Sequence, residues 1–484
     1  MSEKAAAAPA RVVLVQPPSY DWLTPSNGLA LINAHLRAAG VTPRIVDSSM
    51  RVRKALSSRL KRTFKDHVEY HEALTGSPRV VAGLLAREVD AILEGAPDVV
   101  AFAVLTYTEK WSLDMAAAIK ALRPSTRVVF GGAQCLRENN AFEFIRNPSV
   151  DAVMLGEADV SFVKYLRALK RAGKGGTLPR IRGVLMKAAG GEILDGGDEE
   201  GVEDIDSLPF LDFSGFPMKD YVGDAMYINT TRSCVRRCRF CTHFMMQKVY
   251  GVMSPQRTLA EIQHHLETFP NRKLIIFSDS LVNGDTRRLA KLADLLLDFR
   301  LERLARRGED GDFAWSGMAI LHRTTTLALL RKLKASGCIE LAYGLESGSQ
   351  KVIDAMDKKF KITDAEEVIR NTKKAGIRVK TYLQFGFPGE TEEDFRETLV
   401  FIRKNAAFLG QVSISFSEIY KGSDMDLRPE HHGIKLPIED RTRWESSDGT
   451  NTYEIRMDRC RRAAETARKA GIDVVEVYAS KLGF

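Results

Sequence analysis

The chain has 484 residues and a mass of 53.9 kDa, which is enough for two or three domains. Its composition is that of a globular protein, with 44% hydrophobic residues, 28% charged residues and a mean hydropathy of −0.19. No apolar run approaches the roughly 20 residues that a membrane-spanning helix requires. The net charge of +8 comes from basic residues that are mostly interleaved with acidic ones, so nucleic acid is not an expected partner.

Six cysteines without a hydrophobic leader or an even spacing argue against a disulfide framework. Reduced thiols are typical of a cytoplasmic protein, and that is the location we expect.

Residues 1–10 carry no packing pattern and are expected to form a loose arm. Residues 11–172 alternate short apolar runs with helical patterns, which predicts a doubly wound, Rossmann-like α/β domain. The first predicted helix covers residues 28–39. The predicted strands are residues 11–16, 44–47, 98–104, 127–130 and 152–155. Ligands of such sheets bind beyond the carboxyl ends of the strands, which here are followed by Pro17–Asn27, Leu105–Thr108, Gly131–Gln134 and Gly156–Asp159.

A dense basic block lies between Arg51 and Lys65. We interpret it as the solvated face of a helix, and a phosphate-binding patch is the alternative.

Residues 173–224 are rich in glycine and acidic residues, which indicates a hairpin and a linker. The strand and helix alternation then resumes over residues 225–425, with six strand–helix units. This number predicts a partial (β/α)6 barrel of the TIM type, with its chemistry at the carboxyl ends of the strands. Residues 426–484 lose the pattern and are expected to form a small cap on the substrate side. In this cap we expect five residues to be packing or surface residues, namely His431, His432, Trp444, Tyr453 and Cys460. We predict that Cys135 and Cys338 are buried, small hydrophobic residues.

Three cysteines follow the first barrel strand within eight residues, as Cys234-Val-Arg-Arg-Cys238-Arg-Phe-Cys241. Iron–sulfur clusters are usually held by four cysteine thiolates, so three would leave one iron open to a small molecule. A closed Cys3His zinc site with His243 is the alternative, although zinc motifs usually consist of two separated ligand pairs.

The Cys-x3-Cys-x2-Cys motif, with Phe240 before the last cysteine, resembles the radical S-adenosylmethionine (SAM) superfamily. Later segments resemble that family's strand ends in the expected order. They are Phe277-Ser-Asp-Ser280, Tyr343-Gly-Leu-Glu-Ser-Gly-Ser349 and Phe385-Gly-Phe-Pro-Gly-Glu-Thr391. The front half, with Gly131-Gly132 and Gly156-Glu157-Ala-Asp159, resembles the cobalamin-binding domain often fused to it, and Ile205–Phe210 resembles the linker of such proteins. The resemblance covers residues 11–425, and the ordered set of motifs is specific.

This resemblance implies that Cys234, Cys238 and Cys241 hold a [4Fe–4S] cluster that binds SAM at its open iron and cleaves it to a 5′-deoxyadenosyl radical. The cofactor then carries the hard chemistry and the protein supplies placement. The residues implied to contact SAM are Phe240, Ser278, Asp279, Glu346, Gly386, Pro388 and Gly389. Two of these assignments have structural alternatives, because Asp279 could cap a helix and Pro388-Gly389 could form a tight turn.

The residues implied to contact cobalamin are Thr106, Gly131, Gly132, Gly156 and Glu157. The Asp-x-His-x-x-Gly motif that supplies an axial histidine in many cobalamin domains is missing between Gln16 and Gly28, and the first histidine, His35, lies in a predicted helix. We therefore predict that bound cobalamin lacks a histidine ligand from this domain. A degenerate front domain that binds no corrin is the alternative.

The function that this resemblance implies is cobalamin-dependent methylation of a carbon centre in a small molecule or peptide, with an electron donor such as a flavodoxin or ferredoxin as partner. The alternatives are a radical rearrangement, cyclisation or aminocarboxypropyl transfer without methylation. A non-catalytic cluster or corrin sensor that binds nucleic acid is a more remote alternative, because no nucleic-acid motif is present.

Overall fold

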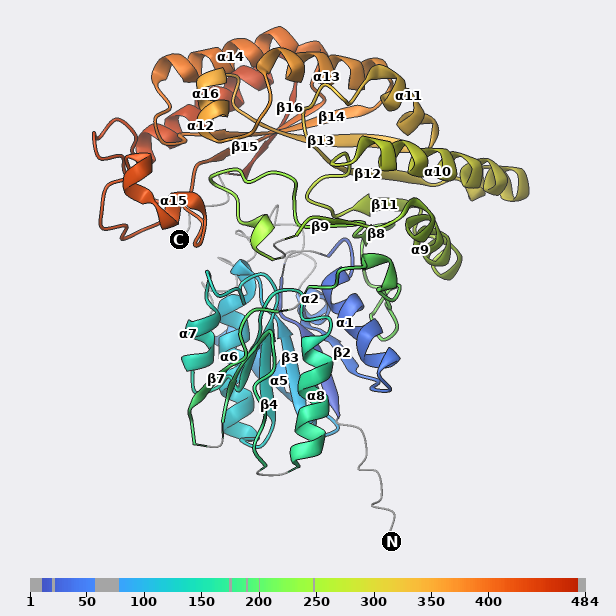
Figure 1. The fold of residues 1–484 in the computed structure, drawn as a ribbon, viewed down its shortest axis with the longest axis vertical. Helices are drawn as coiled ribbons and strands as arrows, with labels where there is room; N and C mark the ends of the chain where they lie inside the picture. Colours follow the sequence, from blue (N-terminus) through green and yellow to red (C-terminus); the bar gives the residue numbers. More distant parts are fainter. Residues whose placement is uncertain are drawn as a thin grey trace. The chain divides into compact units, whose positions relative to one another are not determined.

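The computed structural model describes residues 11–19, 22–56, 78–173, 176–188, 190–199, 201–246 and 249–477 (Figure 1). Its contacts divide the chain into two compact units, Met1–Gly223 with Met245–Gln247, and Asp224–Phe244 with Lys248–Phe484. The arm predicted at residues 1–10 and the basic block beyond residue 56 lie outside the described residues. No helix in the described ranges is long and apolar enough to cross a membrane.

The N-terminal unit contains a seven-stranded sheet with the order β2-β1-β3-β4-β5-β6-β7, in which β1 to β5 are parallel. The strands are β1 (Val12–Gln16), β2 (Arg44–Asp47), β3 (Val99–Ala103), β4 (Arg127–Gly131), β5 (Ala152–Met154), β6 (Val184–Lys187) and β7 (Ile193–Asp195). The helices are α1 (Asn27–Ala38), α2 (Ser48–Ala55), α5 (Pro78–Leu93), α6 (Glu109–Leu122), α7 (Ala141–Arg146) and α8 (Ser161–Ala172).

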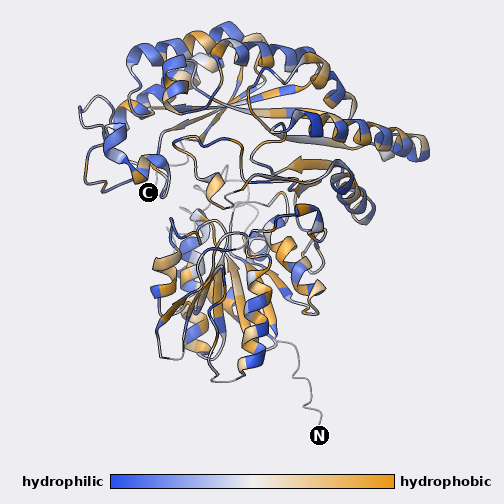
Figure 2. Ribbon diagram, viewed as in Figure 1, coloured by the Kyte–Doolittle hydropathy of each residue, from blue (hydrophilic) through white to orange (hydrophobic). Residues whose placement is uncertain are grey.

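The two faces of this parallel sheet differ in side-chain size. One face carries Val13, Val15, Val100, Phe102 and Phe130, which belong to one buried cluster. Figure 2 shows the strands as hydrophobic, as expected for a parallel sheet buried on both faces. The order 2-1-3-4-5 is a doubly wound one with a switch point between β1 and β3, where such sheets bind ligands. The predicted Rossmann-like architecture is confirmed.

The hairpin β6–β7 lies in the segment that the sequence analysis interpreted as hairpin and linker. β6 pairs antiparallel with β5, and β7 pairs antiparallel with β6. Val184, Leu185 and Met186 are each 0% exposed, so the hairpin extends the sheet and contributes to its core. The contribution of β6 to the core is difficult to predict from the sequence, because glycine-rich and acidic residues surround a strand of only four residues.

The C-terminal unit contains an open, seven-stranded parallel sheet with the order β16-β15-β14-β13-β12-β11-β8, and a two-stranded pair, β9 with β10. The strands are β8 (Ala225–Ile228), β9 (Thr231–Arg232), β10 (Gly251–Val252), β11 (Leu274–Phe277), β12 (Ala314–Ala319), β13 (Cys338–Glu346), β14 (Arg378–Phe385), β15 (Gln411–Phe416) and β16 (Asp473–Glu476). The helices are α9 (Pro255–Thr268), α10 (Thr286–Arg307), α11 (Leu327–Ala335), α12 (Gln350–Ala355), α13 (Ile362–Lys374), α14 (Glu392–Asn405), α15 (Asp424–Leu427) and α16 (Tyr453–Lys469).

Six of these strands are those predicted for the partial barrel, and the sheet does not close. The seventh, β16, comes from the predicted cap and pairs in parallel with β15. In Figure 1 helices α10 to α14 line one face of the sheet, whereas α15 lies apart from them. The strand residues facing the helices are buried, whereas the alternate residues face the concave side and are more exposed.

The segment between β15 and α16 packs over the loops at the carboxyl ends of the strands. Ile419, Met425, Ile434 and Trp444 form a buried cluster with Phe387 and other residues, and Phe240 packs against this cluster. Tyr453, Cys460, Cys135 and Cys338 are also buried, as expected.

Candidate functional site

The cysteine loop begins directly after β8 and is anchored by a buried carboxylate. Asp279 is 2% exposed and accepts hydrogen bonds from Thr230 N (2.6 Å), Thr230 Oγ1 (2.6 Å) and Thr231 N (2.9 Å). Ser233 then adopts a positive φ of 64°, which turns the chain into the loop. Further along, Arg239 N donates to Met356 O (3.1 Å) and Met425 N donates to Arg239 O (3.3 Å). The backbone that carries the cysteines is therefore held at both ends.

The three cysteines are free thiols of intermediate exposure. Burial raises the pKa of each thiol, that of Cys241 to about 11, and the Lys358 ammonium opposes this shift at all three. Arg236 N donates to Cys234 Sγ (3.4 Å) and His243 N donates to Cys241 Sγ (3.5 Å). These backbone donors and the nearby cation stabilise thiolates, which are the form that binds metal.

Glu346 and Lys358 form an ion pair next to this loop. Lys358 Nζ lies 2.7 Å from Glu346 Oε1 and 2.6 Å from Gly344 O. The two side chains are 12% and 10% exposed. The same ammonium lies 5.8 Å from the centroid of the Phe240 ring, which is a cation–π contact. Lys358 therefore links the predicted residues Phe240 and Glu346, and it is a candidate site residue that no sequence motif predicted.

Glu346 reaches this position through a bulge at the end of β13. The register between β13 and β14 shifts between Gly344 and Glu346, and Glu346 has a φ of 66°. Such a conformation costs a non-glycine residue about 1–3 kcal/mol, and it persists only where the surroundings enforce it. Behind it, Gly348 N donates to Thr398 Oγ1 (2.9 Å), and a Cβ on Gly348 would lie 2.8 Å from Thr398 Cα. The Gly-Leu-Glu-Ser-Gly-Ser motif thus fixes the bulge against α14.

The other residues predicted to contact SAM are spread around this edge. Ser278 is exposed, and its Oγ donates to Asn229 Oδ1 (3.0 Å). The alternative that Asp279 is a helix N-cap is wrong, because Asp285 caps α10. A contact between Asp279 and SAM stays a prediction, although every hydrogen bond it makes among the described residues goes to Thr230 or Thr231.

The loop Gly386–Glu390 is in contact with the C-terminal segment. Gly386 has a φ of 78°, and a Cβ there would lie 2.1 Å from Arg456 Cγ. Asn451 Nδ2 donates to Gly386 O (2.9 Å), and Arg459 pairs with the buried Glu390 carboxylate (2.9 Å). The predicted SAM contacts of Gly386, Pro388 and Gly389 stay predictions, and the described hydrogen bonds give this loop a structural role.

The N-terminal unit has a pocket of about 310 Å³ at the carboxyl edge of its sheet. Its floor is the second face of the sheet, where β3 and β4 carry the small residues Ala101, Ala103 and Gly131. The floor also includes Leu14, Gln16, Val129 and Met154, and Gly156 lies just beyond β5. Residues of α1 and Phe162 of α8 line the remaining walls. Because alanine and glycine occupy these positions of β3 and β4, space is left above this face of the sheet.

Four of the five residues predicted to contact cobalamin line this pocket, namely Gly131, Gly132, Gly156 and Glu157. Gly132 has a φ of 103°, and a Cβ would lie 2.9 Å from Val104 O, so glycine is required there. Thr106 is not among the lining residues, and its Oγ1 accepts a hydrogen bond from Gln134 Nε2 (2.7 Å). The lining residues, all of them described, include no histidine, and His35 lies in the last turn of α1.

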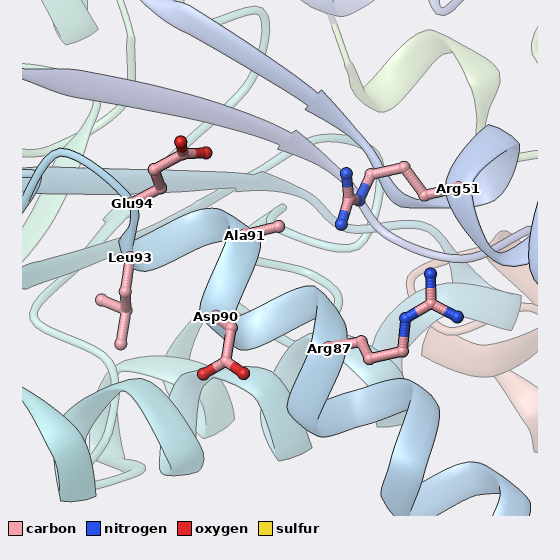
Figure 3. Close-up of a pocket in the computed structure, with 6 residues that line it drawn as sticks. All are labelled: Arg51, Arg87, Asp90, Ala91, Leu93 and Glu94. Carbon is pink, nitrogen blue, oxygen red and sulfur yellow. The ribbon is translucent and has the colours of Figure 1, made fainter.

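A second pocket in this unit tests the phosphate-patch alternative. It is lined by Arg51, Arg87, Asp90, Glu94 and two apolar residues (Figure 3). Arg51 is already paired with the buried Glu88 (2.8 Å), and Lys54 of the same helix is paired with Asp220 (2.6 Å). The described part of the basic block therefore has its charge largely compensated within the unit.

Among the described residues, no group of three or more His, Cys, Asp or Glu side chains is close enough to hold a single metal ion. The cysteines of an iron–sulfur cluster each bind a different iron, so a cluster does not require them to converge on one point. The donor set of three thiols with backbone N–H donors and a nearby cation fits a cluster with an open position.

The chain is similar to known proteins in sequence and in fold. Residues 228–402 match the model of the Radical SAM superfamily. An uncharacterized methyltransferase of Pyrococcus horikoshii is 23% identical over 312 residues, which is 64% of this chain and 64% of that protein. The chain spans between 50% and 64% of the length of the first curated relatives that it matches.

Two solved structures share the fold over most of this chain. The cobalamin-dependent SAM radical enzyme OxsB is 16% identical with a TM-score of 0.65, covering 97% of this chain and 58% of that one. The radical SAM methyltransferase TsrM of Kitasatospora setae, with cobalamin and a [4Fe–4S] cluster bound, is 14% identical with a TM-score of 0.65, covering 89% and 76%. Residues 228–402 therefore match the Radical SAM superfamily, and the chain shares the fold of these two cobalamin-dependent enzymes over most of its length.

Proposed function

We propose that this protein is a cobalamin-dependent radical SAM methyltransferase that acts on a small molecule. The observation that carries the proposal is the grouping of the three thiols, Phe240 and Glu346 around the Lys358 ammonium at the carboxyl edge of the C-terminal sheet. When bound, the cluster, SAM and cobalamin supply one-electron cleavage of SAM and transfer of a methyl group.

The residues of the C-terminal unit would bind the cluster and orient SAM. Cys234, Cys238 and Cys241 hold the cluster as thiolates. Glu346 is fixed by Lys358, so that its second carboxylate oxygen can accept hydrogen bonds from the SAM ribose. Phe240, backed by the apolar cluster of the C-terminal segment, offers a ring face to the adenine and excludes water from that side.

The pocket of the N-terminal unit is the proposed cobalamin site. Gly131, Gly132 and Gly156 allow a bulky cofactor to approach the strand ends, and the apolar floor extends beneath α1 and α8. The cobalamin bound in the two structural neighbours supports this assignment. Since the lining contains no histidine, the EPR spectrum of the cob(II)alamin form should show no nitrogen superhyperfine splitting from imidazole.

The test is anaerobic reconstitution followed by quantification of iron, sulfide and cobalt, and by incubation with SAM, a low-potential reductant and candidate acceptors. Tryptophan belongs among the acceptors, because TsrM has been solved with tryptophan as substrate. A cobalamin-dependent methyltransferase converts SAM to S-adenosylhomocysteine, and radical cleavage adds 5′-deoxyadenosine. A triple Cys234→Ala, Cys238→Ala, Cys241→Ala variant is the control and should form no 5′-deoxyadenosine.

The product ratio separates the alternatives. 5′-Deoxyadenosine without S-adenosylhomocysteine would favour a radical rearrangement or cyclisation, and methylthioadenosine would favour aminocarboxypropyl transfer. Neither product with any acceptor, in protein that has its full complement of iron and cobalt, would contradict the proposal.

A further inference from the structure

The concave face of the C-terminal sheet carries an unusual row of side chains. Parallel pairing places Met318 of β12 beside Ala342 of β13, Ala342 beside Lys380 of β14, and Lys380 beside Gln411 of β15. Met318 is 38% exposed and Lys380 is partly exposed, whereas the alternate residues Gly317, Leu341 and Val379 are buried on the helix side. The row therefore faces the concave side of the sheet.

Lys380 differs from the other charged residues of this face because it has no ion-pair partner among the described residues. Glu346 is paired with Lys358, and Arg378 is shared between Glu340 (3.5 Å) and Asp473 (3.3 Å), which lies beside Gln411 in the row. The Lys380 ammonium instead contacts the Tyr382 ring, whose centroid lies 5.4 Å from Nζ. A cation–π contact at a partly exposed site contributes about 0.5–1 kcal/mol and supplies no carboxylate to pair with the ammonium.

This row lies below the proposed SAM site. Tyr382 is two residues from Lys380 on the same face and pairs with Gly344, whose carbonyl oxygen binds Lys358. Glu346 aligns with Leu383, three residues beyond Lys380, which corresponds to about 10 Å along a strand. A molecule bound on the row would therefore lie deeper in the concave face than SAM, with its reactive carbon toward the strand ends.

We infer that this row binds the acceptor substrate, and that the acceptor is a monoanionic carboxylate with a flat apolar body. A single ammonium without an ion-pair partner matches one negative charge, whereas a phosphate dianion would need further donors. Met318 lies two strands from Lys380, about 10 Å away. Ala342 lies between them, and its small side chain leaves space above the sheet. An apolar body thus fits over Ala342, between the flexible Met318 and the Tyr382 ring. This inference rests on the proposed function only in naming the bound molecule as its acceptor.

The experiment measures binding of 6-fluoro-2-naphthoate and its neutral carboxamide to reconstituted full-length protein by ¹⁹F NMR, with SAM saturating. Wild type should bind the acid at least tenfold more tightly than the amide. K380Q should abolish this preference, K380R should keep it, and K374Q, at an exposed lysine of α13, should behave as wild type.

Equal affinity of wild type for acid and amide, or an undiminished preference in K380Q, would overturn the inference. These outcomes are independent of the proposed function, which is read from 5′-deoxyadenosine and S-adenosylhomocysteine. A protein that forms both products without any preference for the acid would refute the acceptor site alone. A protein with the preference but without SAM turnover would refute the proposed function alone.

Discussion

At the scale of single residues, Lys358 joins the parts of the proposed SAM site. It contacts Glu346, Gly344 and the Phe240 ring, and its charge acts on all three thiols. No motif in the sequence points to it, because it lies twelve residues after Glu346 in a lysine pair of ordinary appearance. By contrast, the spacing of the cysteines and the motif around Glu346 are local in sequence and were predictable.

We expect K358M to weaken SAM binding at least tenfold. Removing the cation leaves the nearly buried Glu346 carboxylate unpaired and free to turn away, and a broken buried pair costs about 3–5 kcal/mol of folding stability as well. The measurement is a titration of the reduced cluster with SAM, followed by EPR. K359M is the matched control, since Lys359 is 64% exposed and pairs with Asp357. Equal SAM affinity in the two variants would show that Lys358 does not position the site.

At the scale of elements, Asp279 connects β11 to the start of the cysteine loop. We expect D279N to lower the iron bound per chain after reconstitution, because an amide has one acceptor oxygen where the carboxylate accepts three hydrogen bonds. D285N makes the same chemical change at the N-cap of α10, where asparagine is well tolerated, and should keep its iron. Full iron content in D279N together with weak SAM binding would instead favour a direct contact with SAM.

Glu199, which accepts hydrogen bonds at the start of α8, makes the stability of the fold depend on pH. Burial raises the pKa of Glu199 to about 7, although Ala158 N and Ser161 Oγ donate hydrogen bonds to its carboxylate. A carboxyl group whose pKa is higher in the folded state stabilises the fold below its unfolded pKa, and this contribution is lost as the pH rises through about 7.

Wild type should therefore melt at a lower temperature at pH 8 than at pH 5, and E199Q should lose much of this difference. E192Q, at an exposed position of the same segment, is the control in thermal denaturation followed by circular dichroism. A pH dependence in E199Q as steep as in wild type would assign the effect to other groups.

At the scale of the whole molecule, the sequence predicted the sheets better than the cavities and edges. Buried strands such as β11 are continuous apolar runs, which are visible in any parallel α/β protein. β16 was missed because Asp473–Glu476 is an edge strand with half-exposed residues. The place of β6 in the sheet was missed because the predicted hairpin pairs antiparallel with β5 instead of adding another parallel strand. The pocket floor depends on which face Ala101, Ala103 and Gly131 share, and this follows only from the register.

The two proposed cofactor sites are built from separate units, so they should be separable by mutation. Ala103 lines the N-terminal pocket, and A103F should fill part of its 310 Å³ and abolish cobalt binding, while iron, sulfide and the SAM-dependent EPR change of the cluster remain as in wild type. The matched control is A117F, at an exposed position of α6, which should retain cobalt. Because radical cleavage of SAM needs the cluster alone and methyl transfer needs the corrin, A103F should still form 5′-deoxyadenosine but lose methylated product. Cobalt retained at the wild-type ratio in A103F would contradict the assignment of this pocket, whatever the activity.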